Sequence, residues 1–414
     1  MKMIISAGGT GGHIYPALAI IKKFQKVDKN FEVLYIGTHN RMENKIVPSQ
    51  NIPYESLKIY GFSKSAIGRD IKNLGYIFKS YYKCIDIMNE FKPDVVVGVG
   101  GYVTLPVIMA AKKLKIKTVI HEQNSIPGKT NKFLSRGVDK VFLSFKESAK
   151  YFSEEVSCVY TGNPSGDNVI NLKPMNKETL GFSKDKKLII VTSGSLGSSA
   201  LNSKLVEFLK LSSKEDYEVL FITGNGNYDS FVKENKFSKN VKVLPYLDNL
   251  ASLFKSSDLV VGRAGAGTIS ELLMAKVPSI LVPSPNVANN HQYYNAKDLD
   301  DAKLAIMIEE KDLTGKGLYE RIKKLLGNDD EYKVILNNLK KHENINSSDK
   351  IYEEIRNHTK KTLKSMGVEV SVKGYENFYL LPSAQTRDKT SVRPEQMIKL
   401  IDHLRSQFDY IILS

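Results

Sequence analysis

A glycine-rich loop near the start of the chain, Ser6–His13, constrains the fold more than any other segment, because four of its eight residues are glycines. Residues 3–5 are apolar and predict a short buried strand, and residues 15–21 predict the start of a buried helix. A strand, a glycine loop and a helix form half of a βαβ unit, which builds parallel sheets. Such a loop presents backbone N–H groups at a helix N-terminus, where phosphate binds, beside the titratable imidazole of His13.

Two common phosphate-binding loops do not match this segment. The dinucleotide fingerprint needs a third glycine after Gly9 and Gly11, where the chain instead continues to Ile14. A P-loop needs a Gly-Lys-Ser/Thr sequence, which is missing here. For this loop alone, an ordinary tight turn with an incidental histidine remains the alternative.

The strand–loop–helix pattern recurs along the chain. Apolar segments predict further strands at residues 32–37, 95–99, 117–120, 140–144, 158–161, 188–192, 218–222, 241–244, 258–261 and 279–283. Small or polar residues follow several of them, in the loops 98–102, 121–124, 193–198, 262–268 and 289–295. Parallel strands gather such loops at one edge of a sheet, where ligands bind. The pattern restarts after the turn Thr161–Pro164, a candidate hinge, so we expect two Rossmann-like domains facing each other across a ligand-binding cleft.

Composition narrows the class of protein. The chain has 414 residues, a net charge of +15 and a pI of about 9.3, which predicts an anionic partner such as nucleic acid, an acidic membrane or a phosphorylated substrate. The two cysteines, Cys84 and Cys158, fit neither a CxxC nor a metal-binding spacing and suggest a reducing compartment. No apolar run approaches the ~20 residues of a membrane span. We therefore expect a cytoplasmic protein without a signal peptide, whose membrane contact is peripheral.

Residues 64–90 predict a helix of mixed character. Its apolar positions, spaced as on one helical face, are Ile67, Ile71, Leu74, Ile77, Phe78 and Tyr81. Its interleaved basic positions are Lys64, Arg69, Lys72, Lys79 and Lys83. One interpretation is an amphipathic helix packed on the sheet, and the other is an apolar patch ringed by lysines that lies on an anionic bilayer. The two are compatible if different faces of the helix serve each.

The loop 262–268 and the helix after it suggest a nucleotide site. We expect Thr268 to open this helix, so that its hydroxyl and N–H point at an anion. Glu271 follows one turn later on the same face, and a carboxylate suits the paired hydroxyls of a ribose. The residues alone therefore indicate a nucleoside diphosphate in the second domain and another anionic substrate in the first.

Taken in order, these motifs resemble those of the MurG family of peptidoglycan glycosyltransferases, over about residues 1–357. The matching segments are Ser6–Pro16, Gly98–Tyr102, His121–Asn124, Thr161–Pro164, Ser193–Gly197, Gly265–Glu271 and His291–Ala296. The resemblance implies a GT-B fold and transfer of N-acetylglucosamine (GlcNAc) from UDP-GlcNAc to the C4 hydroxyl of undecaprenyl-diphospho-N-acetylmuramoyl-pentapeptide, which converts lipid I to lipid II. It further implies inversion at the anomeric carbon, no metal or other cofactor, and action at the cytoplasmic face of the cell membrane.

The resemblance also assigns roles to individual residues. His13 would be the general base, Leu247 would face the uracil, and Gln292 would bind the sugar. The residues for UDP-GlcNAc would be Thr10, Gly11, Gly12, Asn124, Ser195, Leu247, Thr268, Glu271, His291, Gln292 and Asn295. Those for the acceptor diphosphate would be Gly11, Gly12, Gly100, Gly101 and Tyr102. The membrane-facing residues would be Ile67, Lys72, Leu74, Ile77, Phe78 and Lys79.

Two positions depart from the family pattern. An arginine often follows Thr-Gly-Asn-Pro in the family as a phosphate contact, whereas Ser165-Gly166-Asp167 stands here. The loop at Ser193-Gly194 begins with serine where two glycines are usual. The missing cation either weakens donor binding or leaves its task to Arg263, and the sequence favours neither.

We expect four parts along the chain. They are an acceptor- and membrane-binding domain over 1–162, a UDP-GlcNAc domain over 163–340, a closing helix and linker over 341–362, and a tail over 363–414. The tail resembles an internal βαβ-like piece of the MinD family of septum-site ATPases, with strands at 377–381 and 408–413 and a helix at 394–406. It lacks a P-loop, so we expect neither ATP binding nor a function, and trimming at Asn357 should leave activity intact.

Two other classes of function remain open. One is a different GT-B enzyme, either a glycolipid glycosyltransferase or a UDP-GlcNAc epimerase, and the latter would need acidic catalytic residues and no lipid acceptor. The other is a non-catalytic basic module for nucleic acid, which no zinc spacing, RNP motif or basic-aromatic run supports. The partners expected are UDP-GlcNAc, lipid I, the anionic inner leaflet, and cell-wall and division machinery, without nucleic acid.

Overall fold

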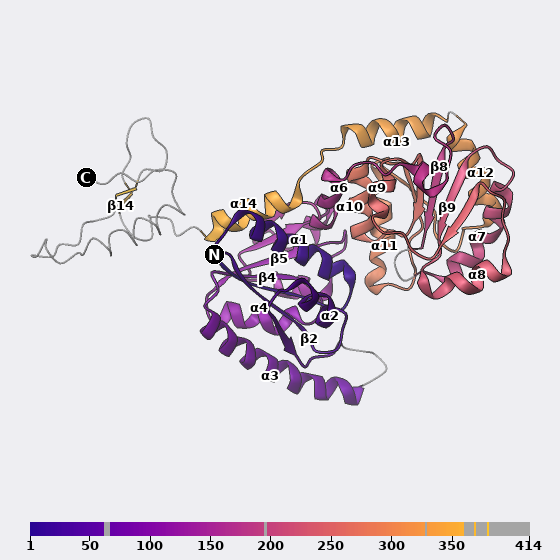
Figure 1. Cartoon of the computed structure of the whole chain (residues 1–414). Helices are drawn as coiled ribbons and strands as arrows, with labels where there is room; N and C mark the ends of the chain where they lie inside the picture. Colours follow the sequence, from indigo (N-terminus) through magenta and orange to yellow (C-terminus); the bar gives the residue numbers. More distant parts are fainter. Residues whose placement is uncertain (62–66, 194–196, 328, 360–367, 370–378, 381–414) are drawn as a thin grey trace, which may run out of the picture. The chain divides into compact units, whose positions relative to one another are not determined.

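The computed structural model describes residues 1–61, 67–193, 197–327, 329–359, 368–369 and 379–380 (Figure 1). The chain divides into two compact units, Met1–Glu353 and Glu354–Ser414. The first unit contains two parallel β-sheets, each covered by helices. This is the α/β architecture that the repeated strand–loop–helix pattern predicted.

The first sheet has seven parallel strands in the order β3-β2-β1-β4-β5-β6-β7. They are β1 (Lys2–Ala7), β2 (Glu32–Thr38), β3 (Tyr54–Leu57), β4 (Val95–Gly100), β5 (Lys117–Glu122), β6 (Lys140–Leu143) and β7 (Cys158–Tyr160). Its helices are α1 (Gly11–Val27), α2 (Glu43–Ile46), α3 (Ile67–Phe91), α4 (Thr104–Lys113) and α5 (Lys129–Leu134), with the 3₁₀ turns η1 (Pro48–Gln50) and η2 (Lys146–Tyr151). The strand order reverses at β1, so the loops after β1 and β4 lie at the switch point where open α/β sheets bind ligands.

The second sheet repeats this plan with six parallel strands in the order β10-β9-β8-β11-β12-β13. They are β8 (Leu188–Thr192), β9 (Glu218–Ile222), β10 (Val241–Leu244), β11 (Leu259–Gly262), β12 (Ser279–Leu281) and β13 (Ile306–Met307). Its helices are α6 (Asp167–Asn171), α7 (Ser199–Ser212), α8 (Tyr228–Glu234), α9 (Leu250–Phe254), α10 (Ala266–Ala275), α11 (His291–Asp301), α12 (Gly315–Leu326) and α13 (Asp330–Lys341), with the 3₁₀ turns η3 (Pro164–Gly166), η4 (Lys177–Leu180), η5 (Asn225–Asn227) and η6 (Ala288–Asn290). The loops after β8 and β11 occupy its switch point.

Continuous apolar runs form these strands because both sheet faces are buried. Ile189 and Val191 pack with α7, α8, α12 and α13, whereas Leu188 and Ile190 point to the opposite face and pack with α9, α10 and α11. This two-sided burial is usual for parallel sheets and explains why the strands read as apolar runs rather than as alternating patterns.

The closing helix, α14 (Ser347–Thr359), returns to the first sheet. Its Tyr352 ring contacts Phe24 of α1, with ring centroids 4.8 Å apart, and Asp349 forms an ion pair with Lys23. Asp167 of α6 accepts hydrogen bonds from the backbone N–H groups of Ser347 and Ser348 and so caps the N-terminus of this helix. None of the helices in the described ranges has the length and apolar character needed to cross a membrane.

In the second unit, two short strands pair antiparallel, namely β14 (Val368–Glu369) and β15 (Tyr379–Leu380). β15 lies within the strand predicted from residue 377, and β14 was not predicted. The predicted helix at 394–406 and strand at 408–413 fall outside the described residues, so the βαβ-like arrangement of the tail stays a prediction.

Candidate active site

The two glycine loops of the first sheet pack backbone against backbone. Gly8 donates its N–H to the carbonyl of Gly100 at 3.1 Å. Gly100 and Gly101 have φ angles of +119° and +91°, which side chains rarely adopt. A Cβ on Gly101 would lie 2.4 Å from the carbonyl oxygen of Gly8, and one on Gly100 would lie 2.6 Å from the ring of His13. Only glycine therefore fits at both positions, and this fixes the loops around the histidine.

The first helix begins directly at the loop. α1 starts at Gly11, and the side chain of Thr10, its N-cap residue, makes no capping hydrogen bond. The N–H groups of Gly11 and Gly12 therefore head the helix at its positive end, which is the geometry that binds phosphate. Thr10 is exposed beside them.

His13 is held in one tautomer. Its Nδ1 lies 3.0 Å from the carbonyl oxygen of Gly8 and 3.4 Å from the hydroxyl of Thr10. Because a carbonyl can only accept, Nδ1 carries the proton, and in the neutral ring Nε2 keeps a free lone pair. Burial lowers the pKa of His13, and the Gly8 carbonyl and the charge of Glu43 partly oppose that shift. The imidazole is thus neutral near pH 7 and is able to accept a proton at Nε2.

Of the four polar residues His121–Asn124, at the end of β5 and just after it, three are buried and engaged with the protein. His121 donates from Nε2 to the Gly162 carbonyl at 3.0 Å and accepts from Gln123 at Nδ1, and burial lowers its pKa to about 4. Glu122 accepts from the backbone N–H groups of Asn124 and Gly128, and from the side-chain amides of Asn124 and of Asn131 on α5. Only Asn124 is partly exposed, so it alone of the four is available to a ligand.

In the second sheet, the structure corrects the placement of Thr268. α10 begins at Ala266 with Gly265 as its N-cap in extended conformation, so Thr268 is the third helical residue and does not open the helix. Its N–H still belongs to the first four, which lack partners within a helix. Glu271 follows in the next turn. Burial raises its pKa to about 7, and no donor in the described ranges hydrogen-bonds its carboxylate.

Of the remaining residues predicted to bind UDP-GlcNAc, Leu247 lies in the loop after β10, and His291 and Gln292 lie in the first turn of α11. Leu247 is half-buried after β10, and Gln292 accepts from the Ser284 N–H at 2.9 Å. The ring of His291 binds the carbonyl of Ala288 through Nδ1 at 2.8 Å. Ser195 falls outside the described residues.

Asn295 connects the two sheets. Its Oδ1 accepts from the N–H of Ser125 at 2.8 Å, and its Nδ2 donates to Asn124 and to the Ala264 carbonyl, both at 3.2 Å. Its amide is therefore engaged within the protein, and its predicted contact with GlcNAc stays a prediction. The link brings Asn124, from the first sheet, next to the loop that precedes α10.

Arg263 lies beside the loop 193–198, but its guanidinium is already paired with other groups of the protein. Its guanidinium binds Glu310 at 2.5 Å, the carbonyls of Val282 and Pro283, and the hydroxyl of Ser198 at 3.1 Å. Ser198 is the N-cap of α7, at the end of the loop 193–198.

Helix α3 presents two different faces. Cys84 and Met88 are buried in the core of the first sheet, and Ile77 packs against that core. Leu74 and Phe78 are 52% and 67% exposed, and Lys79 beside them is exposed. The packing interpretation is therefore confirmed for one face, while membrane contact by the other stays a prediction. The side chains of Ile67 and Lys72 lie outside the described residues.

Tyr102 was predicted to bind the acceptor diphosphate. Its hydroxyl is buried, with no hydrogen-bond partner in the described ranges, and its contact with the acceptor stays a prediction.

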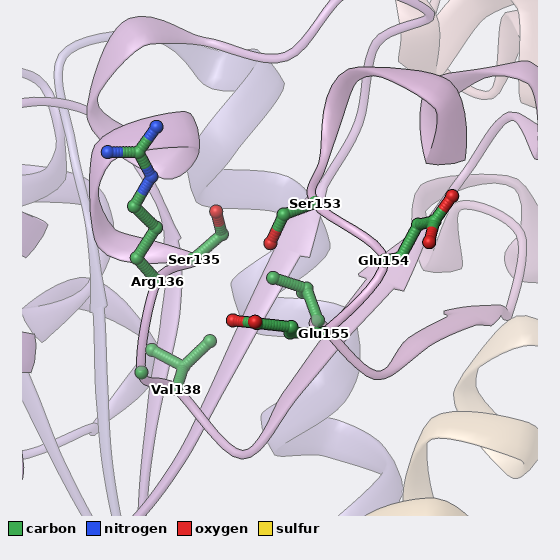
Figure 2. A pocket seen from close by; sticks show the side chains of 8 residues that line it. Ser135, Arg136, Val138, Ser153, Glu154 and Glu155 are labelled. Atoms are coloured by element: carbon green, nitrogen blue, oxygen red, sulfur yellow. The ribbon is translucent and has the colours of Figure 1, made fainter.

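Two surface cavities lie away from the glycine loops. A cavity of about 750 Å³ opens between the loops 135–138 and 153–156 and is lined by Arg136, Glu154 and Glu155 among others (Figure 2). A second one, of about 340 Å³, lies at Lys92, Pro93 and their neighbours. Both precede strands, at the edge opposite the glycine loops, and so do not belong to the candidate site.

Comparison with known proteins finds relatives over most of the chain. Residues 3–143 match the glycosyltransferase family 28 N-terminal domain, and residues 188–355 match the glycosyltransferase family 28 C-terminal domain. A protein of Thermoanaerobacter sp. strain X514 is 41% identical over 365 residues, covering 87% of this chain and 100% of the relative. A protein of Bacillus subtilis strain 168 is 41% identical over 337 residues, covering 80% and 93%. Both are named UDP-N-acetylglucosamine–N-acetylmuramyl-(pentapeptide) pyrophosphoryl-undecaprenol N-acetylglucosamine transferase.

Solved structures show the same fold. The crystal structure of Acinetobacter baumannii MurG matches with a TM-score of 0.70 and 27% identity, covering 86% of this chain and 99% of that one. A putative UDP-N-acetylglucosamine 2-epimerase from Listeria monocytogenes matches with a TM-score of 0.64 but only 14% identity, covering 87% and 97%, and so shares the fold alone. With two Rossmann-like domains of the GT-B type and the identities above, this chain belongs to the MurG family of glycosyltransferases.

Proposed function

We propose that this chain transfers GlcNAc from UDP-GlcNAc to the C4 hydroxyl of undecaprenyl-diphospho-N-acetylmuramoyl-pentapeptide, with inversion at the anomeric carbon. The names of its relatives support the donor and the acceptor. The observation that carries the proposal is the geometry of His13, whose Nδ1 is bound to the Gly8 carbonyl and whose Nε2 is free. The site thus holds a neutral base beside two helix N-termini suited to phosphates.

In the reaction, His13 Nε2 takes the proton of the acceptor C4 hydroxyl while that oxygen attacks C1 of GlcNAc. The bond from C1 to the β-phosphate oxygen breaks, and UDP leaves with the bonding electrons. The N–H groups at the start of α10, including that of Thr268, stabilise the negative charge that develops on the diphosphate. Glu271 binds the ribose hydroxyls, and Leu247 lies against the uracil.

The acceptor diphosphate binds to the first sheet. The N–H groups of Gly11 and Gly12 point out of the start of α1, and Gly100 and Gly101 keep the neighbouring loop free of side chains. A pyrophosphate is able to approach this backbone closely because no Cβ stands in its way.

The exposed face of α3 holds the enzyme on the anionic inner leaflet as a peripheral protein. Leu74 and Phe78 would insert at the level of the lipid headgroups, and Lys79 would bind acidic lipids. This places the first sheet next to a lipid-linked substrate. Contact with cell-wall and division proteins stays a prediction from the family resemblance.

The test is to replace His13 by alanine and to measure transfer and UDP-GlcNAc binding separately. Transfer should fall about 10²–10⁴-fold, the usual contribution of a general base, while donor binding persists. Transfer at the wild-type rate would refute the role of His13. Release of UDP without lipid I, or formation of an epimerised UDP-sugar, would instead favour the epimerase alternative.

A further inference from the structure

Glu43 is a buried carboxylate that none of the sequence motifs includes. It is the first residue of α2, and its side chain is fully buried. Its Oε1 accepts from the N–H and hydroxyl of Thr38 at 3.2 and 2.6 Å, and its Oε2 accepts from the N–H of Gly9 at 3.2 Å. Among the described residues, no lysine, arginine or histidine forms an ion pair with it. A buried carboxylate without a cationic partner relies on its hydrogen bonds, so these donors fix the position of Glu43 against the glycine loop.

Two glycines, which have no side chain, leave the space that this carboxylate occupies. A Cβ on Gly8 would lie 2.5 Å from Glu43 Oε1, and a Cβ on Gly37 would lie 2.9 Å from Glu43 Cγ. Both glycines therefore serve the approach of Glu43 to the glycine loop as well as the loop itself.

A single peptide group connects Glu43 to His13. The N–H of Gly9 donates to Glu43, and the carbonyl of the same peptide unit, which belongs to Gly8, accepts from His13 Nδ1–H at 3.0 Å. A carboxylate on the N–H side polarises the peptide and makes its carbonyl oxygen a stronger acceptor. The chain of hydrogen bonds thus runs from the carboxylate through the peptide to the imidazole.

We propose that Glu43 is a positioning residue for His13, acting through the Gly8–Gly9 peptide to keep the imidazole proton on Nδ1 and Nε2 free. This inference rests on the proposed role of His13 as the base. When Nε2 takes the proton of the acceptor hydroxyl, the polarised Gly8 carbonyl stabilises the imidazolium that forms. The arrangement is a carboxylate–histidine pair with a peptide group inserted between its members.

In the part of the chain that the structure describes, the titratable groups that face these two residues come from α11 and from the first sheet. His13 is faced by Glu43 from α2 and by His291 from α11, and each of these changes the balance of charge around the ring. Glu43 is faced by Tyr35 and Tyr54, whose hydroxyls remain neutral because burial and the nearby carboxylate raise their pKa values. Loss of the Glu43 charge should therefore lower the pKa of His13 further.

The test compares the wild-type enzyme with Glu43→Gln by the pH dependence of kcat, with both substrates saturating. Glutamine removes the negative charge of Glu43, and its side-chain NH₂ group would face one of the N–H groups that donate to Glu43. The acidic limb of the profile should move to lower pH by about 0.5 unit, since a nearby charge is lost. The plateau should fall about tenfold, because a less basic and less well-oriented imidazole is a weaker base. KM for UDP-GlcNAc should stay within twofold.

Control variants separate the alternatives. Tyr54→Phe removes a hydroxyl from the same buried cluster, where it donates to the Thr38 carbonyl, and should leave the profile unchanged. The proposal would be overturned if the acidic limb and the plateau of the Glu43→Gln profile matched those of the wild type, or if this variant changed KM alone. If Glu43→Gln does not fold, Glu43→Asp takes its place. Its carboxylate is one methylene shorter, so when it is held by Thr38 it no longer reaches the N–H of Gly9. An unchanged kcat in this variant would refute the proposal.

His13→Ala, measured in parallel, distinguishes the two levels of failure. If it abolishes transfer while Glu43→Gln behaves as wild type, only the role of Glu43 is wrong. If it leaves transfer intact, the base assignment itself is wrong, and the proposal for Glu43 falls with it.

Discussion

Glu271 is a buried carboxylate with no hydrogen-bond partner among the described residues, and a ribose would supply donors to it. Its pKa of about 7 reflects burial alone. Hydroxyl groups donate to the ionised carboxylate, so binding of UDP should lower this pKa. Among the residues that the sequence predicted, it is therefore the one whose protonation should report directly on donor binding.

The affinity for UDP should weaken as the pH falls through 7. In its proposed role, only the ionised form of Glu271 would accept from both ribose hydroxyls, and linkage with a free-enzyme pKa near 7 gives a loss of about tenfold between pH 8 and pH 6. Calorimetric titration with UDP across this range checks it. Glu271→Gln is the control, with weaker affinity that changes little with pH. A flat profile for the wild type would contradict the prediction.

At the level of single residues, the sequence predicted those whose motif is local. His13 stands inside its glycine loop, and Glu271 stands one turn from Thr268, so spacing alone pointed to both. Glu43 was missed because its partner Gly9 lies 34 positions away, and only the fold brings them together. For the same reason, the sequence did not reveal that Asn295 accepts a hydrogen bond from Ser125, 170 positions away.

Helix α3 shows how one element serves two environments. Its exposed residues Leu74, Phe78 and Tyr82 are spaced by four and therefore lie on one side, whereas Cys84 and Met88 face the core. The sequence analysis placed Leu74, Ile77 and Phe78 in one apolar set and did not separate the exposed residues from the packed one. Separating them requires knowing which side the sheet covers.

Replacing Leu74 and Phe78 together by glutamate should weaken binding to vesicles of anionic phospholipid at least tenfold. Two exposed apolar side chains are lost and two charges are added that acidic lipids repel. Vesicle cosedimentation measures this effect. Val334→Glu, on α13 of the second sheet and also exposed, is the matched control and should bind as wild type. Equal binding by all three proteins would refute a membrane role for α3.

Element boundaries were predicted less well than element types. The parallel strands formed where apolar runs predicted them, because burial on both faces requires such runs. The start of α10 was misplaced, since Gly265 and Gly267 are equally small and only the extended backbone of Gly265 marks it as the N-cap.

At the scale of the whole molecule, the chain divides into a long catalytic unit and a short tail. Neither family 28 domain match extends beyond residue 355, and the first unit ends at Glu353. α14, however, continues to Thr359, so the truncation expected at Asn357 would cut its last turn. The proper end for a shortened enzyme is therefore Thr359.

A chain ending at Thr359 should keep the transfer activity and thermal stability of the full chain. The candidate site and the contacts of Tyr352 and Asp349 with α1 are all retained. A chain ending at Asn346 is the control: it loses α14, and its melting temperature should fall by several degrees as that apolar contact is exposed. Inactivity of the longer truncation would show that the tail contributes to function.

The segment that leaves the first sheet, around Gly162 and Asp167, contacts the segment that returns to it, at the start of α14. A Cβ on Gly162 would lie 2.5 Å from the hydroxyl of Ser347, and Asp167 caps the helix that Ser347 begins. The two segments that link the sheets therefore meet at the same place. Any rotation of one sheet relative to the other would therefore turn about this contact, and the stiffness of the contact would limit the range of that rotation.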